Sequence, residues 1–520
     1  MIKKSIYGHF SFFDTKEKLF QLGLLFAIII GFYYKLLSYS NIILDSDSAQ
    51  FGLYSYSMAH GNILFHEMYL SSSGKYFLEL LIFHLFPQFL SNYDPIILKL
   101  SLFLIFALTV FIFSFFVYYI TKKITSALIF AALFVSLNSS AFSSFADISH
   151  MFSVLFCGLA LIFTCYFISK NHEQNYILKS LILIIIFSFC ISIASYSDPY
   201  VILCYTMPII GAYLFFFNNK TKITNLFFIF VATFSLICYL FGDWIIQTII
   251  PDPPRIIPYM PLEMQPFTHI IPYILFFLEG FSRILNNNLY QLWDGFTIEN
   301  IGVSIVIIAI FVYLLSIYLV HRNLIIFKNK FFSAYLILAF MVFFIFYVFT
   351  SMSAEGLSHQ KYLLYPIIVV LLLISLSYSS KNQIFTILIC LFICFGLIGN
   401  FYSNPKFEID SNQNQTELID FLKNNSLYYG YSDYWDSNLI TYLSKFDVTV
   451  RALTIDGNES VQTYPYNNND NWYNYPDGAD VFILTRKENT LLTDESLAHV
   501  LDIDPPKKVM HSNEYTIYVW

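Results

Sequence analysis

Long apolar stretches alternate with short polar ones along the first 400 residues of the chain. Each apolar stretch approaches the roughly 20 residues that an α-helix needs to cross a lipid bilayer. The pattern predicts about eleven membrane-spanning helices. Their ranges are 19–38, 96–120, 124–142, 150–169, 178–196, 200–217, 225–247, 301–320, 331–350, 361–379 and 383–402.

The apolar run 76–90 differs from the predicted spans. It is short, contains Glu79 and His84, and ends at Pro87. We therefore predict a re-entrant or interfacial helix here. The positive-inside rule supports this choice, because it gathers the Lys and Arg residues of the short loops on the side of the N-terminus. The N-terminus is then predicted to be cytoplasmic, and the long loops 39–95 and 248–300 to be external.

Composition places most of the chain in lipid. Hydrophobic residues make up 57% of it and charged residues only 12%, against about 25% charged in a soluble domain. We expect a polytopic α-helical protein of the cell (inner or plasma) membrane, in contact with membrane lipid. Residues 1–402 would form its membrane domain.

The segment 403–520 has a different character, with 8 Lys and Arg against 18 Asp and Glu. An acidic segment does not suit nucleic acid as a partner. Helix-like and strand-like pieces alternate, which predicts a small extracytoplasmic α/β domain. The helix-like pieces are 416–424, 435–444 and 494–501, and the strand-like pieces are 448–453, 481–485 and 515–520. The Asn-rich stretch 467–474 is predicted to be a polar loop.

Two acids, Asp45 and Asp47, follow the first predicted span directly. After them come an amphipathic piece, 49–60, and a turn at Gly61-Asn62. A carboxylate at the mouth of a helix bundle could be a general base that takes a proton from an acceptor hydroxyl. Asp-Ser-Asp-Ser is also well suited to cap the following helix. The sequence leaves both roles open.

Several short motifs resemble, in their order, a family of membrane enzymes. They are Asp47-Ser48-Ala49-Gln50-Phe51-Gly52, Gly61-Asn62-Ile63-Leu64, Tyr76-Phe77-Leu78-Glu79-Leu80-Leu81 and Leu85-Phe86-Pro87. Together they resemble the first external loop of the GT-C glycosyltransferases, most closely the branch with the protein O-mannosyltransferases and the lipid A aminoarabinose transferase. The resemblance implies a GT-C-like fold. It also implies sugar transfer from a polyprenyl-phosphate-linked donor to an extracytoplasmic acceptor, such as an envelope glycan, a lipid or a protein.

The resemblance also implies roles for four acids and a lysine. Asp47, with Asp45 beside it, takes the position of the catalytic base, and Glu79 approximates the acid at which the loop re-enters the membrane. Asp147 resembles an acid that helps to hold a divalent metal such as Mg or Mn in related enzymes; a helix N-cap is the alternative. Lys361, in Lys361-Tyr362-Leu363-Leu364-Tyr365-Pro366, resembles an Arg suited to the donor phosphate, and the alternative is a snorkelling interfacial Lys.

Cations are scarce on the predicted external side, so those present are candidates for the donor phosphate. They are Arg255 and Arg283 in one long loop and Lys75 in the other. Surface salt bridges are an equally good interpretation of the two arginines. His150 stands beside an apolar run, where a packed side chain is the usual role. Tyr434-Trp435-Asp436-Ser437 and Arg451 could line a sugar-binding surface or serve core and capping roles.

Departures from the family pattern leave two other functions open. Ser48 and Gln50 stand where the family has Glu and Arg, and Ser195-Tyr196-Ser197-Asp198-Pro199 lacks the Lys of its Thr-Lys-Gly-Pro segment. A catalytically inactive relative that serves as a scaffold would show such changes. A transporter or flippase of lipid-linked saccharide should carry ionisable residues at mid-bilayer depth and paired broken helices, and the sequence gives little sign of either.

Overall fold

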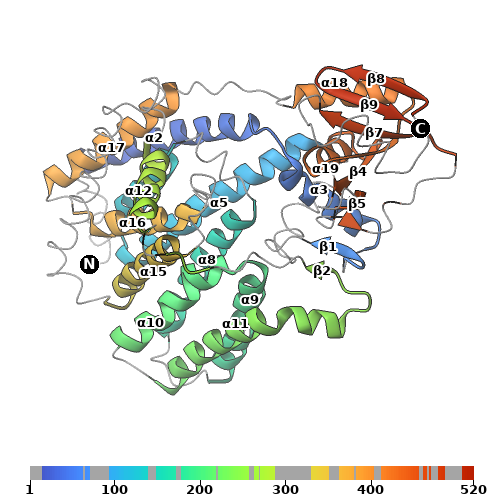
Figure 1. Ribbon diagram of the computed structural model, residues 1–520. Helices are drawn as coiled ribbons and strands as arrows, with labels where there is room; N and C mark the ends of the chain where they lie inside the picture. The colour runs from blue at the N-terminus through green and yellow to red at the C-terminus, as the bar shows by residue number, and fades with distance from the viewer. Residues whose placement is uncertain are drawn as a thin grey trace, which may run out of the picture.

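The computed structural model shows a mostly helical protein with a small sheet near its C-terminus (Figure 1). It describes residues 15–62, 65–70, 93–138, 148–170, 177–217, 221–256, 263–266, 268, 270–286, 330–350, 362–379, 382–402, 412–455, 461–464, 468–469, 473, 478–486 and 506–520. Within these residues, seven helices are long and apolar enough to cross a membrane. They are α2 (Thr15–Ser40), α5 (Pro95–Thr121), α8 (Ile148–Lys170), α9 (Ile177–Ser197), α11 (Lys222–Ile249), α15 (Lys330–Phe349) and α17 (Gln383–Tyr402).

Shorter apolar helices occupy three more of the predicted spans. They are α6 (Ile124–Val135), the continuous pair η3 (Ile202–Thr206) and α10 (Met207–Phe216), and α16 (Leu364–Ser377). Every predicted span in the described part of the chain therefore coincides with a helix. The predicted span 301–320 and the predicted re-entrant helix 76–90 lie outside the described residues.

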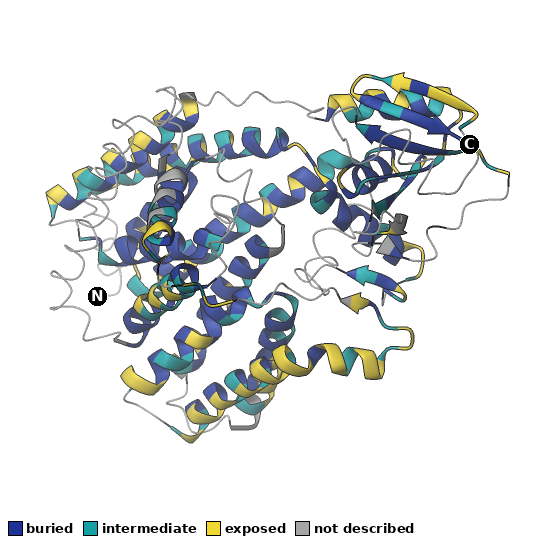
Figure 2. Cartoon of the chain, in the orientation of Figure 1, coloured by how far each residue is buried: buried dark blue, intermediate teal, exposed yellow. Residues whose placement is uncertain are grey.

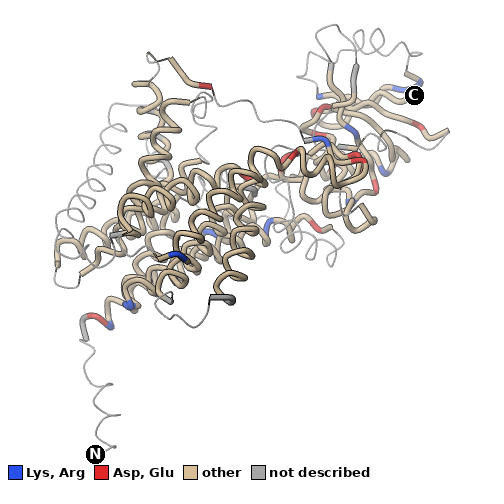
Figure 3. Tube along the Cα trace, turned by 90° about the horizontal axis from the view of Figure 1, so that it is seen from below, with Lys and Arg blue, Asp and Glu red and all other residues tan. Residues whose placement is uncertain are grey.

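The surface of the helical part is rich in large apolar side chains. In α11, for example, Leu240 is 59% exposed and Trp244 66% exposed, and Figure 2 shows long exposed stretches on α10 and α11. Soluble monomers rarely expose contiguous apolar surface on this scale. Figure 3 shows that charged residues are sparse along these helices. This surface is the one expected of helices that contact lipid.

Helices α2 and α6 pack in parallel, and their contacts define the two ends of the helix bundle. At one end Gln21 of α2 donates to Thr125 Oγ1 of α6 at 2.8 Å. At the other, Lys35 Nζ of α2 donates to the Leu137 carbonyl, just past α6, at 2.5 Å. The C-terminal domain lies at this second end, where α2 finishes and α5 begins (Figure 1). We refer to it as the domain-bearing end.

Two buried lysines join helices near the domain-bearing end. Lys35 is fully buried and Lys99 is 3% exposed. Lys99 Nζ of α5 donates to the carbonyl of Ser40, the last residue of α2, at 3.1 Å. Both side-chain amino groups therefore donate to main-chain carbonyls at or just past helix C-termini. These contacts hold α2, α5 and α6 together at this end.

The C-terminal domain is built on a six-stranded sheet, and α18 (Gln413–Asn424) and α19 (Tyr434–Leu443) belong to it. The central strand β3 is parallel to β4 and β7, and the outer strands are antiparallel to their neighbours. The prediction of a small α/β domain is thus confirmed. The sheet order is β5 (Val461–Thr463), β4 (Thr449–Ile455), β3 (Tyr429–Ser432), β7 (Val481–Arg486), β9 (Tyr515–Val519) and β8 (Lys508–Ser512). The predicted helical piece 494–501 lies outside the described residues.

A second, three-stranded sheet corrects the prediction of a plain polar loop at 467–474. Asn468–Asn469 forms β6, which pairs antiparallel with β1 (Met68–Leu70). On its other side β1 pairs in parallel with β2 (Arg255–Ile256). Asn is a poor strand former by itself, so the pairing depends on main-chain bonds to distant segments that local sequence does not reveal. The sheet ties both long loops to the C-terminal domain.

Helix α3 (Ser46–Ala59) occupies the predicted amphipathic piece, but most of its residues, polar ones included, are buried. It begins three residues earlier than predicted, and ten of its fourteen residues are buried. Helix α19 of the C-terminal domain packs along it. The Tyr56 ring stacks on Phe446, with ring centroids 3.8 Å apart. The C-terminal domain therefore covers α3, and most of the helix is buried against it.

Gly52 sets the closeness of this packing. A Cβ at this position would lie 2.2 Å from two ring carbons of Tyr442, whose side chain is fully buried. We expect Gly52→Ala to weaken the docking of the C-terminal domain by about 1–3 kcal/mol, because the ring cannot move without repacking. Gly23→Ala in α2 is the matched control, since no atom lies within 4 Å of the added Cβ.

Hydrogen–deuterium exchange of the detergent-solubilised protein measures the effect. Gly52→Ala should speed exchange in α3 and α19, and Gly23→Ala should not. Equal protection of these helices in both variants would contradict the close packing of Tyr442 on Gly52.

Candidate functional site

The two predicted acids of the first loop take different positions. Asp45 is the N-cap of α3, and its side chain accepts hydrogen bonds from Ser48 N at 2.8 Å and Ser48 Oγ at 2.7 Å. Its side chain is exposed. The capping role that the sequence left open for this segment therefore falls to Asp45. The catalytic role suggested for it stays a prediction.

Asp47 lies in the first turn of α3, where a negative charge suits the helix dipole. It is half-buried and accepts a hydrogen bond of 2.5 Å from the Tyr434 hydroxyl. Tyr434 is the first residue of α19. Ser46 Oγ, next to Asp47, donates to the backbone carbonyls of Tyr434 and Trp435. The N-termini of α3 and α19 thus meet at Asp47.

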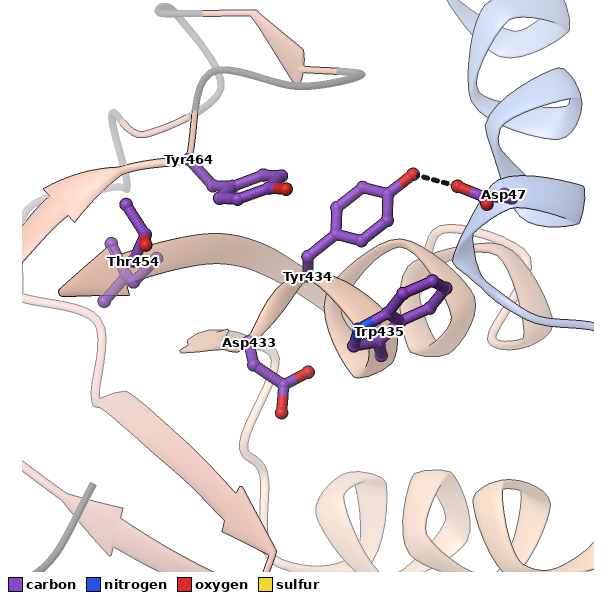
Figure 4. A pocket seen from close by; sticks show the side chains of 7 residues that line it. Asp47, Asp433, Tyr434, Trp435, Thr454 and Tyr464 are labelled. Carbon is purple, nitrogen blue, oxygen red and sulfur yellow. Dashed lines mark hydrogen bonds between the residues drawn. The ribbon is translucent and has the colours of Figure 1, made fainter. Parts of the chain in front are cut away.

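A cavity of about 390 Å³ opens at this meeting point. Tyr434 lies between two further aromatic rings in Figure 4, with its hydroxyl directed at Asp47. Its ring centroid is 5.3 Å from that of Trp435 and 5.0 Å from that of Tyr464. A cavity of this kind, with convergent polar groups and aromatic walls, is typical of small-molecule sites. Its lining residues are Asp47, Asp433, Tyr434, Trp435, Leu453, Thr454 and Tyr464.

The cavity is acidic. Asp433 caps α19 by accepting the Asp436 N–H at 3.1 Å. Burial raises the pKa of the Asp433 carboxyl, and the nearby charge of Asp436 raises it further. Burial and the Asp47 charge raise the pKa of the Tyr464 hydroxyl. The described lining contains two carboxyl groups and no Lys or Arg, so this cavity suits hydroxyl-bearing ligands better than a phosphate.

The predicted cations are placed only in part. Arg255 is an exposed residue of β2; it donates to the Tyr69 hydroxyl of β1, and its guanidinium lies 5.1 Å from that ring's centroid. Arg283 lies in α12 (Ile270–Asn286), and its side chain is not among the described ones. Lys75, Glu79, Asp147 and Lys361 lie outside the described residues. The expected gathering of all these groups at one mouth therefore stays a prediction.

Neighbours of Asp147 and Lys361 do meet at the domain-bearing end. His150 at the start of α8 and Tyr362 just before α16 have ring centroids 4.9 Å apart. Tyr200, after α9, donates from its hydroxyl to the Tyr362 carbonyl at 2.7 Å. The start of α8, the segment after α9 and the residue that precedes α16 are thus brought together.

A buried acid that the sequence analysis missed organises this contact. Asp198, 2% exposed, accepts hydrogen bonds from His150 Nδ1 at 2.8 Å, Ser153 Oγ at 2.7 Å and Tyr200 N at 3.0 Å. His150 is packed, as expected, yet it also has an ionisable partner. The sequence did contain a signal for this contact. His150 and Ser153 are one helical turn apart and so share a helix face, and Asp198 follows the next predicted span.

A metal site is not evident in the described part of the chain. Among those residues no group of three or more His, Cys, Asp or Glu side chains comes together in a way that could hold a metal ion. Asp147, the predicted ligand of a divalent cation, lies outside them. The requirement for magnesium or manganese stays a prediction.

Comparison with known proteins adds no assignment: no protein-family model matches the chain, and no curated protein is significantly similar to it. The resemblance to GT-C enzymes therefore rests on the spaced motifs alone.

Removal of the Asp198 carboxylate should destabilise the helix bundle. Asp198→Ala would leave His150, Ser153 and the Tyr200 N–H without their buried acceptor, at a cost of about 1–3 kcal/mol. Ser375→Ala is the matched control, because the buried Ser375 hydroxyl donates to Leu371 O within its own helix. The thermal unfolding midpoint in detergent should fall clearly for Asp198→Ala and little for Ser375→Ala. Equal midpoints would refute the organising role of Asp198.

Proposed function

We propose that this chain is a GT-C-like glycosyltransferase that moves a sugar from a polyprenyl-phosphate-linked donor to an extracytoplasmic acceptor. The observation that carries the proposal is the position of Asp47. Its half-buried carboxyl group lines a cavity at the domain-bearing end and is held by Tyr434 of the C-terminal domain. A general base needs this combination of a fixed orientation and access to a ligand.

In this proposal eleven helices cross the membrane and the domain-bearing end is extracytoplasmic. Lysines at the opposite ends of the helices support that orientation. Lys122 and Lys123 lie between α5 and α6, and Lys222 begins α11. By the positive-inside rule, short loops with such residues are cytoplasmic. The N-terminus would then be cytoplasmic and the C-terminal domain external.

The proposed reaction is a single displacement at the anomeric carbon of the donor sugar. The acceptor hydroxyl oxygen forms the new bond to this carbon while the bond to the phosphate oxygen breaks. Asp47 takes the proton of the hydroxyl and later releases it to water, and the polyprenyl phosphate leaves with the electron pair. The Tyr434 hydroxyl orients the Asp47 carboxylate through the hydrogen bond between them.

The leaving phosphate requires positive charge nearby. Lys361, Lys75, Arg255 and Arg283 are the candidates, and Glu79 would position the donor sugar. Arg255 supports this part of the proposal, because β2 is joined to the C-terminal domain through β1 and β6. Its guanidinium is exposed and oriented by Tyr69. A planar guanidinium can bind two phosphate oxygens at once.

Asp47→Asn should lower the rate of transfer from a polyprenyl-phospho-sugar by about 10²–10⁴, the usual contribution of a general base. The amide is nearly the same size, so the fold should persist. Asp45→Asn separates capping from chemistry, because Asn caps a helix as well as Asp does, so a loss of transfer in this variant would indicate a catalytic role for Asp45. The measurement is transfer of radiolabelled sugar by purified protein, with unfolding midpoints as the check on folding.

Undiminished transfer by a folded Asp47→Asn protein would reject Asp47 as the base. The absence of any transfer by the native protein, tested with mannosyl, glucosyl and aminoarabinosyl donors and envelope acceptors, would favour the transporter or the inactive scaffold. Mass spectrometry of lipid-linked sugars and envelope glycans, with and without the gene, distinguishes transfer from those two alternatives in the cell.

A further inference from the structure

The walls of the cavity beside Asp47 come from the C-terminal domain, which the proposed chemistry uses only through the Tyr434 hydroxyl. Six of the seven lining residues belong to that domain, and Asp47 alone comes from α3. A domain that served only to cover the end of the helix bundle would not need an aromatic cavity next to Asp47. The composition of this hollow indicates what it binds.

Three aromatic rings form one wall. Trp435 is the accessible one, at 55% exposed, whereas Tyr434 is 7% exposed and Tyr464 half-buried. An exposed indole next to a cavity offers a flat, electron-rich face. The faces of pyranose rings present C–H groups that pack well on such a surface.

Carboxyl and hydroxyl groups lie around the same hollow. Asp47, Asp433 and Thr454 are positioned in its lining, and each can accept hydrogen bonds from sugar hydroxyls. A stacking face with a few acceptor groups is the arrangement that distinguishes a saccharide site from a purely apolar pocket.

Charge decides which substrate belongs here. Two carboxyl groups line the cavity, and no Lys or Arg does so among the described residues. A phosphate or a uronic acid would be repelled. The donor, which carries a phosphate, therefore has to approach Asp47 from another side, and the acceptor is left for this cavity.

We propose that the cavity lined by Trp435, Tyr464 and Asp433 is the acceptor subsite, and that it binds a pyranose unit that carries no negative charge. The acceptor is then a glycan or glycoconjugate with a neutral or amino sugar at its growing end. The identification of the bound sugar as the acceptor rests on the proposed function. The prediction that this cavity binds a saccharide does not. Trp435 stacks on the sugar, Asp433 binds its hydroxyls, and the reacting hydroxyl faces Asp47.

The test measures saccharide binding to the full-length protein without any donor. The protein is held in phosphatidylcholine nanodiscs, because glycoside detergents would compete for the site. Neutral trisaccharides of mannose, glucose, galactose and N-acetylglucosamine, a glucosamine trimer, and trigalacturonate are titrated by saturation-transfer NMR and tryptophan fluorescence. Trigalacturonate and the galactose trisaccharide form a matched pair that differs mainly in charge.

At least one neutral or amino trisaccharide should bind with a Kd below about 10 mM. Trp435→Ala should weaken it about tenfold, as truncation of a stacking Trp usually does, and Trp435→Phe should weaken it less. Tyr428→Ala, the control at an aromatic residue that is 42% exposed and does not line the cavity, should have no effect. Trigalacturonate should bind at least about tenfold more weakly than the galactose trisaccharide. Asp433→Asn, which still caps α19, should reduce this difference in Kd, because it removes one negative charge from the cavity.

The inference is overturned if no neutral or amino trisaccharide binds, if Trp435→Ala leaves binding unchanged, or if trigalacturonate binds as tightly as its neutral counterpart. These outcomes are independent of catalysis. Saccharide binding together with undiminished transfer by Asp47→Asn would reject the proposed base and keep the saccharide site. Transfer that depends on Asp47 without saccharide binding would reject the acceptor subsite alone.

Discussion

The packing of α19 against α3 fixes the positions of Tyr434 and Trp435 next to Asp47. Gly52 lets the Tyr442 ring approach the α3 backbone, and Phe446 stacks on Tyr56 further along the same helix. At the N-terminal end of this contact, Ser46 binds two carbonyls of α19 and Tyr434 binds Asp47. One helix pair therefore attaches the C-terminal domain and orients the proposed base. If this packing were lost, the cavity would have no wall.

A second constraint comes from the apolar surroundings of the helices. A polar side chain buried among apolar helices needs a partner, because no water is available there to replace one. Lys35, Lys99 and Asp198 meet this need near the domain-bearing end, by binding helix-end carbonyls or a set of donors. Their contacts join α2, α5, α6, α8 and α9 at the level where the chemistry is proposed. Buried polar groups thus stiffen the rim of the bundle on which the site depends.

The sequence was informative where one physical signal dominates. Apolar length alone located the long apolar helices among the described residues, as with α17, whose bounds Gln383–Tyr402 match the predicted span; it did not locate α12, which lies within the predicted loop 248–300. The strand-like pieces 448–453, 481–485 and 515–520 likewise coincide with β4, β7 and β9. Strand β3 was not predicted, because Tyr429-Gly430-Tyr431-Ser432 resembles a turn sequence. Its Gly430 is required because the Phe482 ring leaves no space for a Cβ. Such a requirement belongs to the packed structure and leaves no local pattern.

Site residues were predictable only one segment at a time. Asp47 stood out because it follows a predicted span, but its partner Tyr434 is 387 positions away in the sequence. In the sequence, Asp198 was considered only as part of a segment that lacks the family's Lys. In the structure it binds His150 from the preceding helix. Contacts of this kind follow from how helices and domains are placed in space. Neither the period of the apolar residues nor the charge of a loop specifies that placement.

The account depends most on the hydrogen bond between Asp47 and Tyr434, and a double-mutant cycle measures it directly. The free energy of unfolding in detergent would be determined for Asp47→Ala, Tyr434→Phe and the double variant, because Ala leaves no acceptor for the Tyr434 hydroxyl. We expect a coupling energy of about 1–3 kcal/mol, as for a buried hydrogen bond to a charged group. Effects that add to within about 0.3–0.5 kcal/mol would show that the two side chains do not interact. The proposed base would then have lost its link to the C-terminal domain.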